Sequence, residues 1–224
     1  MSFRDLKSEQ SSSLSQAGFA PFGVDHAPLR PSQARNAIAA SGISANSRID
    51  TLRGKVAARD LREGDQVKIY GDKFATLRWV GLSRQGNNSD LPMRRVETDG
   101  SPSTTLLSPD NLVMVRHPRT ELLFGTNEVL CPARFLADAG LFVQDDTVTP
   151  VFVHLLFETY ELIKCGEDWV ESLMPNMSHI RSADLGVAKE ITAVLPRLET
   201  KHGLASYVRN RPVLNAREAL VLFS

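Results

Sequence analysis

Cysteine is scarce in this chain. Its 224 residues include only Cys131 and Cys165, and neither lies in a CxxC spacing. Two cysteines exclude the disulfide framework of a small secreted domain, and the missing CxxC pair argues against a zinc motif. The segment EVLCPARFL around Cys131 is apolar rather than cationic. Both thiols are therefore predicted to be buried or half-buried and unreactive.

Long apolar runs are also missing. No run reaches the roughly 18 residues needed to cross a bilayer. The N-terminal MSFRDLKSEQSSSLSQ lacks the apolar stretch of a secretory signal. We therefore predict no membrane partner and a cytoplasmic location by default, while export by a non-classical route would leave no trace in the sequence.

Neither sign of charge is in excess. Lysine plus arginine total 26, and aspartate plus glutamate also total 26. No overall field favours DNA, RNA or an anionic membrane. We expect no nucleic-acid partner, and the identity of any protein partner stays open.

Motifs for cofactors and metals are absent as well. GxGxxG, GxxxxGK(S/T) and GxSxG do not occur. This removes the sequence signals of dinucleotide binding, of a phosphate loop and of a hydrolase nucleophile elbow. The five histidines are scattered and stand in no zinc spacing. We predict no cofactor and no metal site.

What the chain does contain indicates three parts. Residues 1–40 are rich in serine, glutamine, proline and glycine, which predicts a flexible N-terminal tail. Residues 41–178 hold short apolar and β-branched runs between turn signals, typical of a mainly β domain. Residues 179–224 carry apolar residues at helical spacing, which predicts a C-terminal helical extension.

Local patterns place individual elements. QVKIY at 66–70 alternates apolar and polar side chains like a strand, after a turn at Gly64. Ser182 is predicted to cap a helix that Pro196 ends. The helical segments expected are a short turn at 32–42, a short helix at 131–140, a longer helix at 182–195 and a final helix at 215–224.

Seven segments stand in a recognisable order along the chain: IDTLRG, DLREGDQV, LRWVG, LLSPDNLVMV, EVLCPARFLA, VFVHLLFETYELIKCGEDWVESLMPN and RPVLNAREALVL. The series resembles the bacterial Hint-domain proteins of the Hedgehog/intein type, over residues 43–178 plus the C-terminal signature. Each segment alone is a weak signal, and their order makes the resemblance specific. It implies a mainly β, horseshoe-like antiparallel fold, here with a short C-terminal helical segment.

The resemblance also implies self-processing chemistry. In active members of the family a cysteine opens the domain and attacks the preceding carbonyl, so that a peptide bond becomes a thioester. Histidines polarise that carbonyl and protonate the leaving amine. An oxyanion site must also hold the tetrahedral intermediate.

The position of the opening nucleophile departs from the family pattern. The family has Gly-Thr four residues after the cysteine, and Asn-Ser stands there at 46–47, so the cysteine position falls on Gly42. Ser41 and Ser44 are the nearest hydroxyls. A serine needs an adjacent base to act as a nucleophile. Composition alone also fits a plain linker that enters the first strand.

The proton-transfer motifs depart as well. Where many relatives have Ser-Pro-x-His, this chain has SPDN, and Asn111 cannot carry a proton near pH 7. In VFVHLLFETY the first histidine of the family motif is kept as His154, and the second is replaced by Tyr160. Alternation along a strand would put His154 and Glu158 on the same side. A lone histidine in an apolar strand is also typical of a hydrogen-bonded core residue.

Three hypotheses follow. The first is a Hint-domain protein related to autoproteolysis and protein splicing, with cleavage lost or much weakened, that acts as a scaffold or binding module. The second is a slow autoproteolytic element in which Ser41 is the nucleophile and His154 the acid or base. The third is an unrelated β-rich protein that binds a partner through its C-terminal helix.

Overall fold

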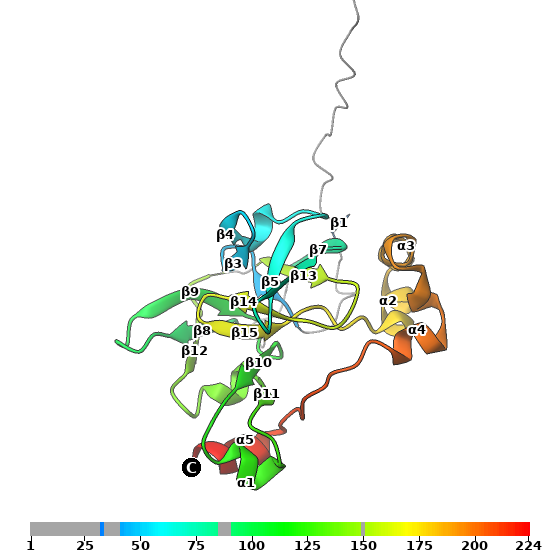
Figure 1. Ribbon diagram of the computed structural model, residues 1–224. Coiled ribbons are helices and arrows are strands. Elements are labelled where there is room, and N and C mark those ends of the chain that lie inside the picture. Colours follow the sequence, from blue (N-terminus) through cyan, green and yellow to red (C-terminus); the bar gives the residue numbers. More distant parts are fainter. Residues whose placement is uncertain (1–31, 34–40, 85–90, 149–150) are drawn as a thin grey trace, which may run out of the picture.

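The computed structural model describes residues 32–33, 41–84, 91–148 and 151–224. The N-terminal tail predicted for residues 1–40 and most of the helical turn predicted at 32–42 lie outside these ranges. Figure 1 shows the strands gathered in the middle of the molecule, with short helices on two sides of them.

The first sheet of the described part has seven strands in the order β1-β7-β13-β2-β9-β8-β12. β1 pairs with β7 in parallel, and the other neighbouring pairs are antiparallel. In sequence order the strands are β1 (Ser32–Gln33), β2 (Ile43–Ser44), β7 (Trp79–Arg84), β8 (Met93–Val96), β9 (Pro102–Leu107), β12 (Phe142–Gln144) and β13 (Val151–Leu156).

The second sheet has eight strands, all in antiparallel pairs within the described ranges. Its order is β11-β10-β15-β14-β3-β5-β6, and β4 pairs with β3. The strands are β3 (Arg48–Thr51), β4 (Gly54–Ala57), β5 (Gln66–Ile69), β6 (Lys73–Thr76), β10 (Leu112–Val115), β11 (Val129–Pro132), β14 (Leu162–Cys165) and β15 (Asp168–Glu171).

The strand and turn signals near Gly64 are confirmed. Gly64 has φ of +90°, in the left-handed region that favours glycine. In β5, Val67 and Ile69 are buried while Lys68 is half-buried, as period-two alternation requires. A hairpin formed by β3 and β4 precedes this turn, and a 3₁₀ turn at Ala58–Asp60 joins the hairpin to it.

Both sheets contribute to one apolar core. Ile43 and Val153 from the first sheet and Ile49 and Ile163 from the second belong to a single buried cluster. The core also contains Cys131 and Cys165, which confirms the prediction of buried thiols. Burial raises the pKa of each thiol to about 12, so neither is a thiolate near neutral pH.

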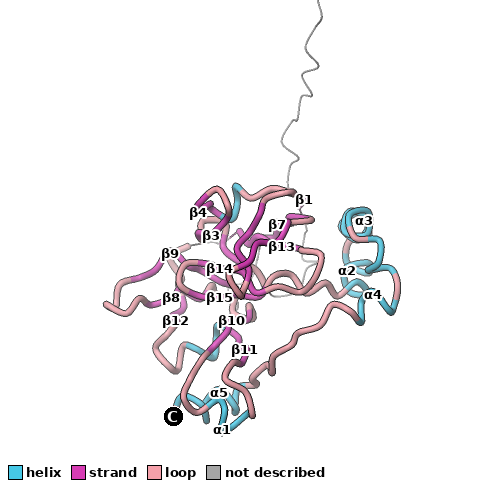
Figure 2. Tube along the Cα trace, viewed as in Figure 1, coloured by secondary structure: helices cyan, strands magenta, loops and turns pink. Residues whose placement is uncertain are grey.

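Short helices pack on one flank of the sheets, as Figure 2 shows. They are α2 (Met177–Ala183), α3 (Leu185–Val194) and α4 (Lys201–Ala205), with a 3₁₀ turn at Pro196–Glu199. Their apolar faces form a second cluster with Trp79 and Leu156. Pro196 does end the preceding helix, and the 3₁₀ helix at Ala133–Leu136 confirms the predicted short helix inside the β region.

The predicted N-cap at Ser182 is wrong. Ser182 lies inside α2, and its hydroxyl donates to the carbonyl of His179. The caps are Asn176 for α2 and Asp184 for α3, whose side-chain oxygens accept from backbone N–H groups in the following turn. The helix expected at 182–195 is therefore the end of one helix and the whole of the next, separated at Asp184.

The chain then returns across the β domain. Leu130 donates to the carbonyl of Pro212 and accepts from the N–H of Leu214, so the return segment lies beside β11. It leads into α5 (Ala216–Phe223), which confirms the predicted final helix and begins with a capping box of Asn215 and Glu218. α5 lies beside α1 (Thr120–Phe124), because Arg119 donates to the carbonyl oxygens of Leu222 and Ser224.

The fold is mainly antiparallel β with a short C-terminal helical segment, as the sequence predicts. Within the described ranges, no helix is both long enough and apolar enough to cross a membrane.

Candidate functional site

His154 lies on β13, a central strand of the first sheet, and is almost completely buried. Its Nε2 is 2.7 Å from the Oγ of Ser83 on the neighbouring strand β7. Burial lowers the pKa of His154 to about 4, and a hydrogen bond with the backbone of Ser41 offsets part of that effect. At pH 7 the imidazole is therefore neutral.

Gly42, the residue before β2, lies opposite His154. β2 and β13 pair Ile43 with Val153 and Ser44 with Phe152, which brings Gly42 opposite the histidine. A Cβ atom at position 42 would lie 3.1 Å from Cε1 of His154 and 2.7 Å from Cβ of Phe152. The second distance is shorter than a normal contact, so the glycine leaves no room for a side chain unless β13 shifts.

The SPDN turn contacts the same residue. The N–H of Gly42 donates to Oγ of Ser108 at 2.8 Å, and the N–H of Ser108 donates to the carbonyl of Gly42 at 2.9 Å. A hydrogen bond from the N–H of Asn111 to the carbonyl of Ser108 closes the turn. The turn chemistry expected of SPDN is therefore present, and it fixes Asn111 near the start of the domain.

Asn111 is buried, and its Oδ1 has no hydrogen-bond partner among the described residues. It lines a small cavity, here called the histidine cavity, of about 10 Å³. That volume suits roughly one water molecule. The cavity is lined by Ser41, Gly42, Ile43, Asn111, Val153, His154, Leu155, Glu171, Ser172 and Leu173.

A buried ion pair borders the histidine cavity. The Glu171 carboxylate is almost wholly inaccessible and accepts two hydrogen bonds from Arg209, at 2.5 and 3.0 Å. Arg209 comes from the return segment after α4, so the C-terminal part of the chain neutralises a charge beside the cavity. Such a bidentate pair offsets the cost of burying the carboxylate.

Tyr160, which replaces the second histidine of the family motif, is not among the residues that line the histidine cavity. It packs between two apolar clusters in the loop after β13. Burial and the nearby Glu171 carboxylate raise the pKa of Tyr160 well above its ordinary value. Its phenol therefore stays protonated and is not a base.

The structure brings Ser41 and His154 together, the two residues predicted as site residues. Both line the histidine cavity, and the Ser41 backbone is a hydrogen-bond partner of the imidazole. Ser44 lies in β2 outside this cavity. Glu158 does not share a face with His154, because β13 ends at Leu156; Glu158 is exposed and pairs with arginines.

Three residues that contribute to the surroundings of His154 and Gly42 were not predicted from the sequence. Ser83 reaches His154 through the pairing of β7 and β13, which no local pattern encodes. Ser108 belongs to a recognised turn, but its bond to Gly42 spans 66 positions of sequence. Glu171 did give a signal, since a carboxylate inside the apolar run WVESL calls for a buried partner.

The arrangement lacks a side chain at position 42, and it offers a neutral imidazole and an amide that cannot shuttle protons. The hydroxyl of Ser108 accepts from the N–H of Gly42, and the hydroxyl of Ser83 contacts His154. Among the described residues, no three His, Cys, Asp or Glu side chains are grouped as metal ligands. The geometry thus brings a backbone segment close to a histidine without supplying a nucleophile at the residue opposite it.

A family model described as the Hint domain matches residues 42–177. The chain belongs to the Hint-domain family. It is thus related to self-splicing inteins, and the hypothesis of an unrelated β protein is wrong. No curated protein matches this Hint domain in sequence.

Solved structures similar to this Hint domain include three inteins. The crystal structure of gp41-1 intein has 8% sequence identity and a TM-score of 0.36, covering 60% of this chain and 99% of that one. A splice-inactive, glutathione-linked variant of the AceL NrdHF class 3 split intein has 9% identity and a TM-score of 0.37, covering 59% and 97%. The MchDnaB-1 intein has 10% identity and a TM-score of 0.34, covering 58% and 98%.

Proposed function

We propose that this Hint domain does not cut its own backbone and that it acts as a scaffold or binding module. The observation that carries the proposal is Gly42. The family spacing assigns the opening cysteine to this position, and here the residue opposite His154 has no side chain.

Attack on a peptide carbonyl requires a nucleophilic atom beside it. At position 42 the sulfur of a cysteine would attack the carbonyl of Ser41. Glycine supplies no such atom, and the Cβ of Phe152 occupies the space in which a side chain would begin. The Ser41–Gly42 peptide bond therefore has no attacking atom on residue 42.

Expulsion of the amine requires a proton at its nitrogen. His154, with a pKa of about 4, carries no spare proton at pH 7. Asn111 stands where many relatives have the histidine of Ser-Pro-x-His, and its amide does not release a proton. Loss of a nucleophile or of its proton shuttle typically lowers a rate by orders of magnitude, and both are altered here.

The alternative is slow autoproteolysis at Ser41, and one observation favours it: Ser41 and His154 line the same cavity. In this reaction Oγ of Ser41 bonds to the carbonyl carbon of residue 40, and the C–N bond to Ser41 breaks. The hydroxyl proton passes through the imidazole to the nitrogen, which leaves an ester. Water or hydroxylamine then cleaves that ester and releases residues 1–40.

Intact-mass spectrometry distinguishes the two. We expect full-length protein, incubated for days at pH 7 with and without hydroxylamine, to keep the mass of all 224 residues. A new fragment that begins at Ser41 supports the alternative and refutes the proposal. The Ser41→Ala variant is the matched control, because a fragment produced by contaminating protease would persist in it.

A further inference from the structure

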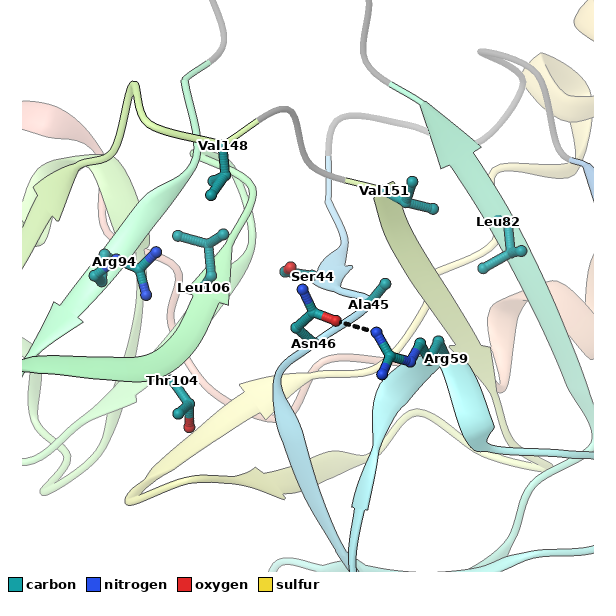
Figure 3. A pocket seen from close by; sticks show the side chains of 10 residues that line it. All are labelled: Ser44, Ala45, Asn46, Arg59, Leu82, Arg94, Thr104, Leu106, Val148 and Val151. Carbon is teal, nitrogen blue, oxygen red and sulfur yellow. Dashed lines mark hydrogen bonds between the residues drawn. The ribbon is translucent and has the colours of Figure 1, made fainter.

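A second cavity, of about 520 Å³, opens on the other side of β2. It is called the arginine pocket here and is lined by the ten residues labelled in Figure 3. None of these residues lines the histidine cavity. The volume lies within the usual range for small-molecule sites.

The arginine pocket carries an excess of positive charge. Among the described residues, the charged ones that line it are Arg59 and Arg94, and none that lines it is acidic. Arg94 is neutralised, because it pairs with the buried Asp145 and donates to the carbonyl of Ser103.

Arg59 is only weakly neutralised. Its Nη1 donates to the neutral Oδ1 of Asn46, and its closest carboxylate among the described residues is that of Asp60, 3.9 Å from Nε. Both side chains of the Arg59–Asp60 pair are about 60% exposed, so the pair contributes little. The guanidinium keeps donors for an incoming anion, and its flat fork matches a carboxylate.

Most of the remaining wall is aliphatic. Leu82 and Val151 lie on the side of Arg59 in Figure 3, and Leu106 and Val148 lie on the side of Arg94. Val148 is partly exposed to solvent. An apolar wall beside one cation suits a ligand with an aliphatic body and one negative end.

The backbone around the arginine pocket is already paired. Ser47 Oγ donates to the carbonyl of Leu106 and accepts its N–H, and Ala45 pairs with Val151 and Arg59. No unpaired strand edge is therefore offered at these positions for an added strand. A ligand of this pocket would therefore be bound by the Arg59 side chain and by the aliphatic wall.

We propose that the arginine pocket binds a carboxylate attached to a short branched aliphatic group, with the carboxylate on Arg59. This chemistry occurs at the C-terminus of a peptide that ends in leucine or valine and in free branched-chain acids. The inference rests on the proposed function, since it gives the binding module a ligand class.

Isothermal titration calorimetry on the full-length protein at pH 7 and low salt tests the proposal. The probes are acetyl-Gly-Gly-Leu with a free carboxylate, the same peptide as its amide, and 4-methylpentanoate. We expect the free peptide acid to bind about tenfold or more tightly than its amide, as is typical of a charge-assisted hydrogen bond. If the peptide acid and 4-methylpentanoate bind with equal affinity, a free branched-chain acid is sufficient as the ligand. If the peptide acid binds more tightly, the ligand is the C-terminus of a peptide.

Two variants locate the binding. Arg59→Gln should weaken peptide binding about tenfold, whereas Arg62→Gln, an exposed arginine outside the pocket, should leave it within twofold. Val148→Asp should also weaken it, because a negative charge on the pocket wall repels the carboxylate. The proposal is overturned if the amide binds as tightly as the acid, if Arg59→Gln binds like wild type, or if neither acid binds at about 10 mM. If the protein stays intact in mass spectrometry but binds neither acid, only this inference is overturned. If the protein cuts itself, the proposed function is overturned, whatever the titration shows.

Discussion

Six consecutive residues pass between two very different cavities. Residues 41–43 line the histidine cavity, and residues 44–46 line the arginine pocket. The first holds about 10 Å³ and contains a neutral imidazole; the second holds about 520 Å³ and has an arginine with only weak partners. The comparison sets a small buried cavity around His154 against a larger pocket for which we propose a ligand.

The polar groups of the two cavities also differ in their hydrogen-bond and ion-pair partners. Around the histidine cavity, His154 is held by Ser83 and the Glu171 carboxylate by Arg209, so its polar groups mostly serve the fold. In the arginine pocket, Arg59 relies on exposed partners that water can replace. Substitutions around the histidine cavity should therefore change the stability of the protein, and substitutions in the arginine pocket should change ligand binding.

The largest effect is expected from Arg209→Met. It leaves the buried Glu171 carboxylate without its partner, which should lower the free energy of unfolding by about 3 kcal/mol. Urea denaturation measures the loss. Arg53→Met is the matched control, because Arg53 pairs with Asp65 at the surface, where such a pair contributes under about 1 kcal/mol. Equal losses in the two variants would refute the structural role given to Arg209.

The next largest effect expected is a pH dependence of the free energy of unfolding, caused by His154. Its pKa falls from 6.5 to about 4 on folding, so the unfolded chain binds the proton more tightly. Stability from this group is complete above pH 6.5 and is lost as pH falls toward 4, by roughly 3 kcal/mol in total. Urea denaturation at several pH values should show this slope in wild type and a shallower one in His154→Gln. Parallel curves for the two proteins would contradict a buried neutral imidazole.

A smaller effect is expected from Gly42→Ala. The added Cβ meets Cβ of Phe152 at 2.7 Å, and overpacking of this kind typically costs about 1–3 kcal/mol. Gly186→Ala in α3 serves as the control, because alanine favours a helix and the new atom there meets only the end of the Asp184 side chain. A thermal shift assay compares them. An unchanged melting temperature in Gly42→Ala would show that the histidine cavity has room for a side chain.

The smallest effect is expected from Arg59→Gln on stability. Because its partners are exposed, the free energy of unfolding should change by less than about 0.5 kcal/mol. A loss near that of Arg209→Met, measured in the same denaturation series, would mean that Arg59 serves the fold and would remove the contrast between the two cavities.

Local patterns predicted much of the fold but less of the site. The turn at Gly64 and the alternation of β5 depend on neighbouring residues, and both are confirmed. The N-cap prediction at Ser182 is wrong because serine, asparagine and aspartate compete as caps, and the break at Asp184 depends on how α2 and α3 pack. Ser83 reaches His154 through strand pairing, and Glu171 is paired with an arginine 38 positions away; local patterns encode neither partner.

The most direct test of the central claim is the mass of the purified full-length protein after days at pH 7 with hydroxylamine. The account predicts one species with the mass of all 224 residues. Fragments that meet at Ser41 or at Gly42, and that disappear in His154→Gln, would show that this Hint domain still cuts itself and would contradict the account.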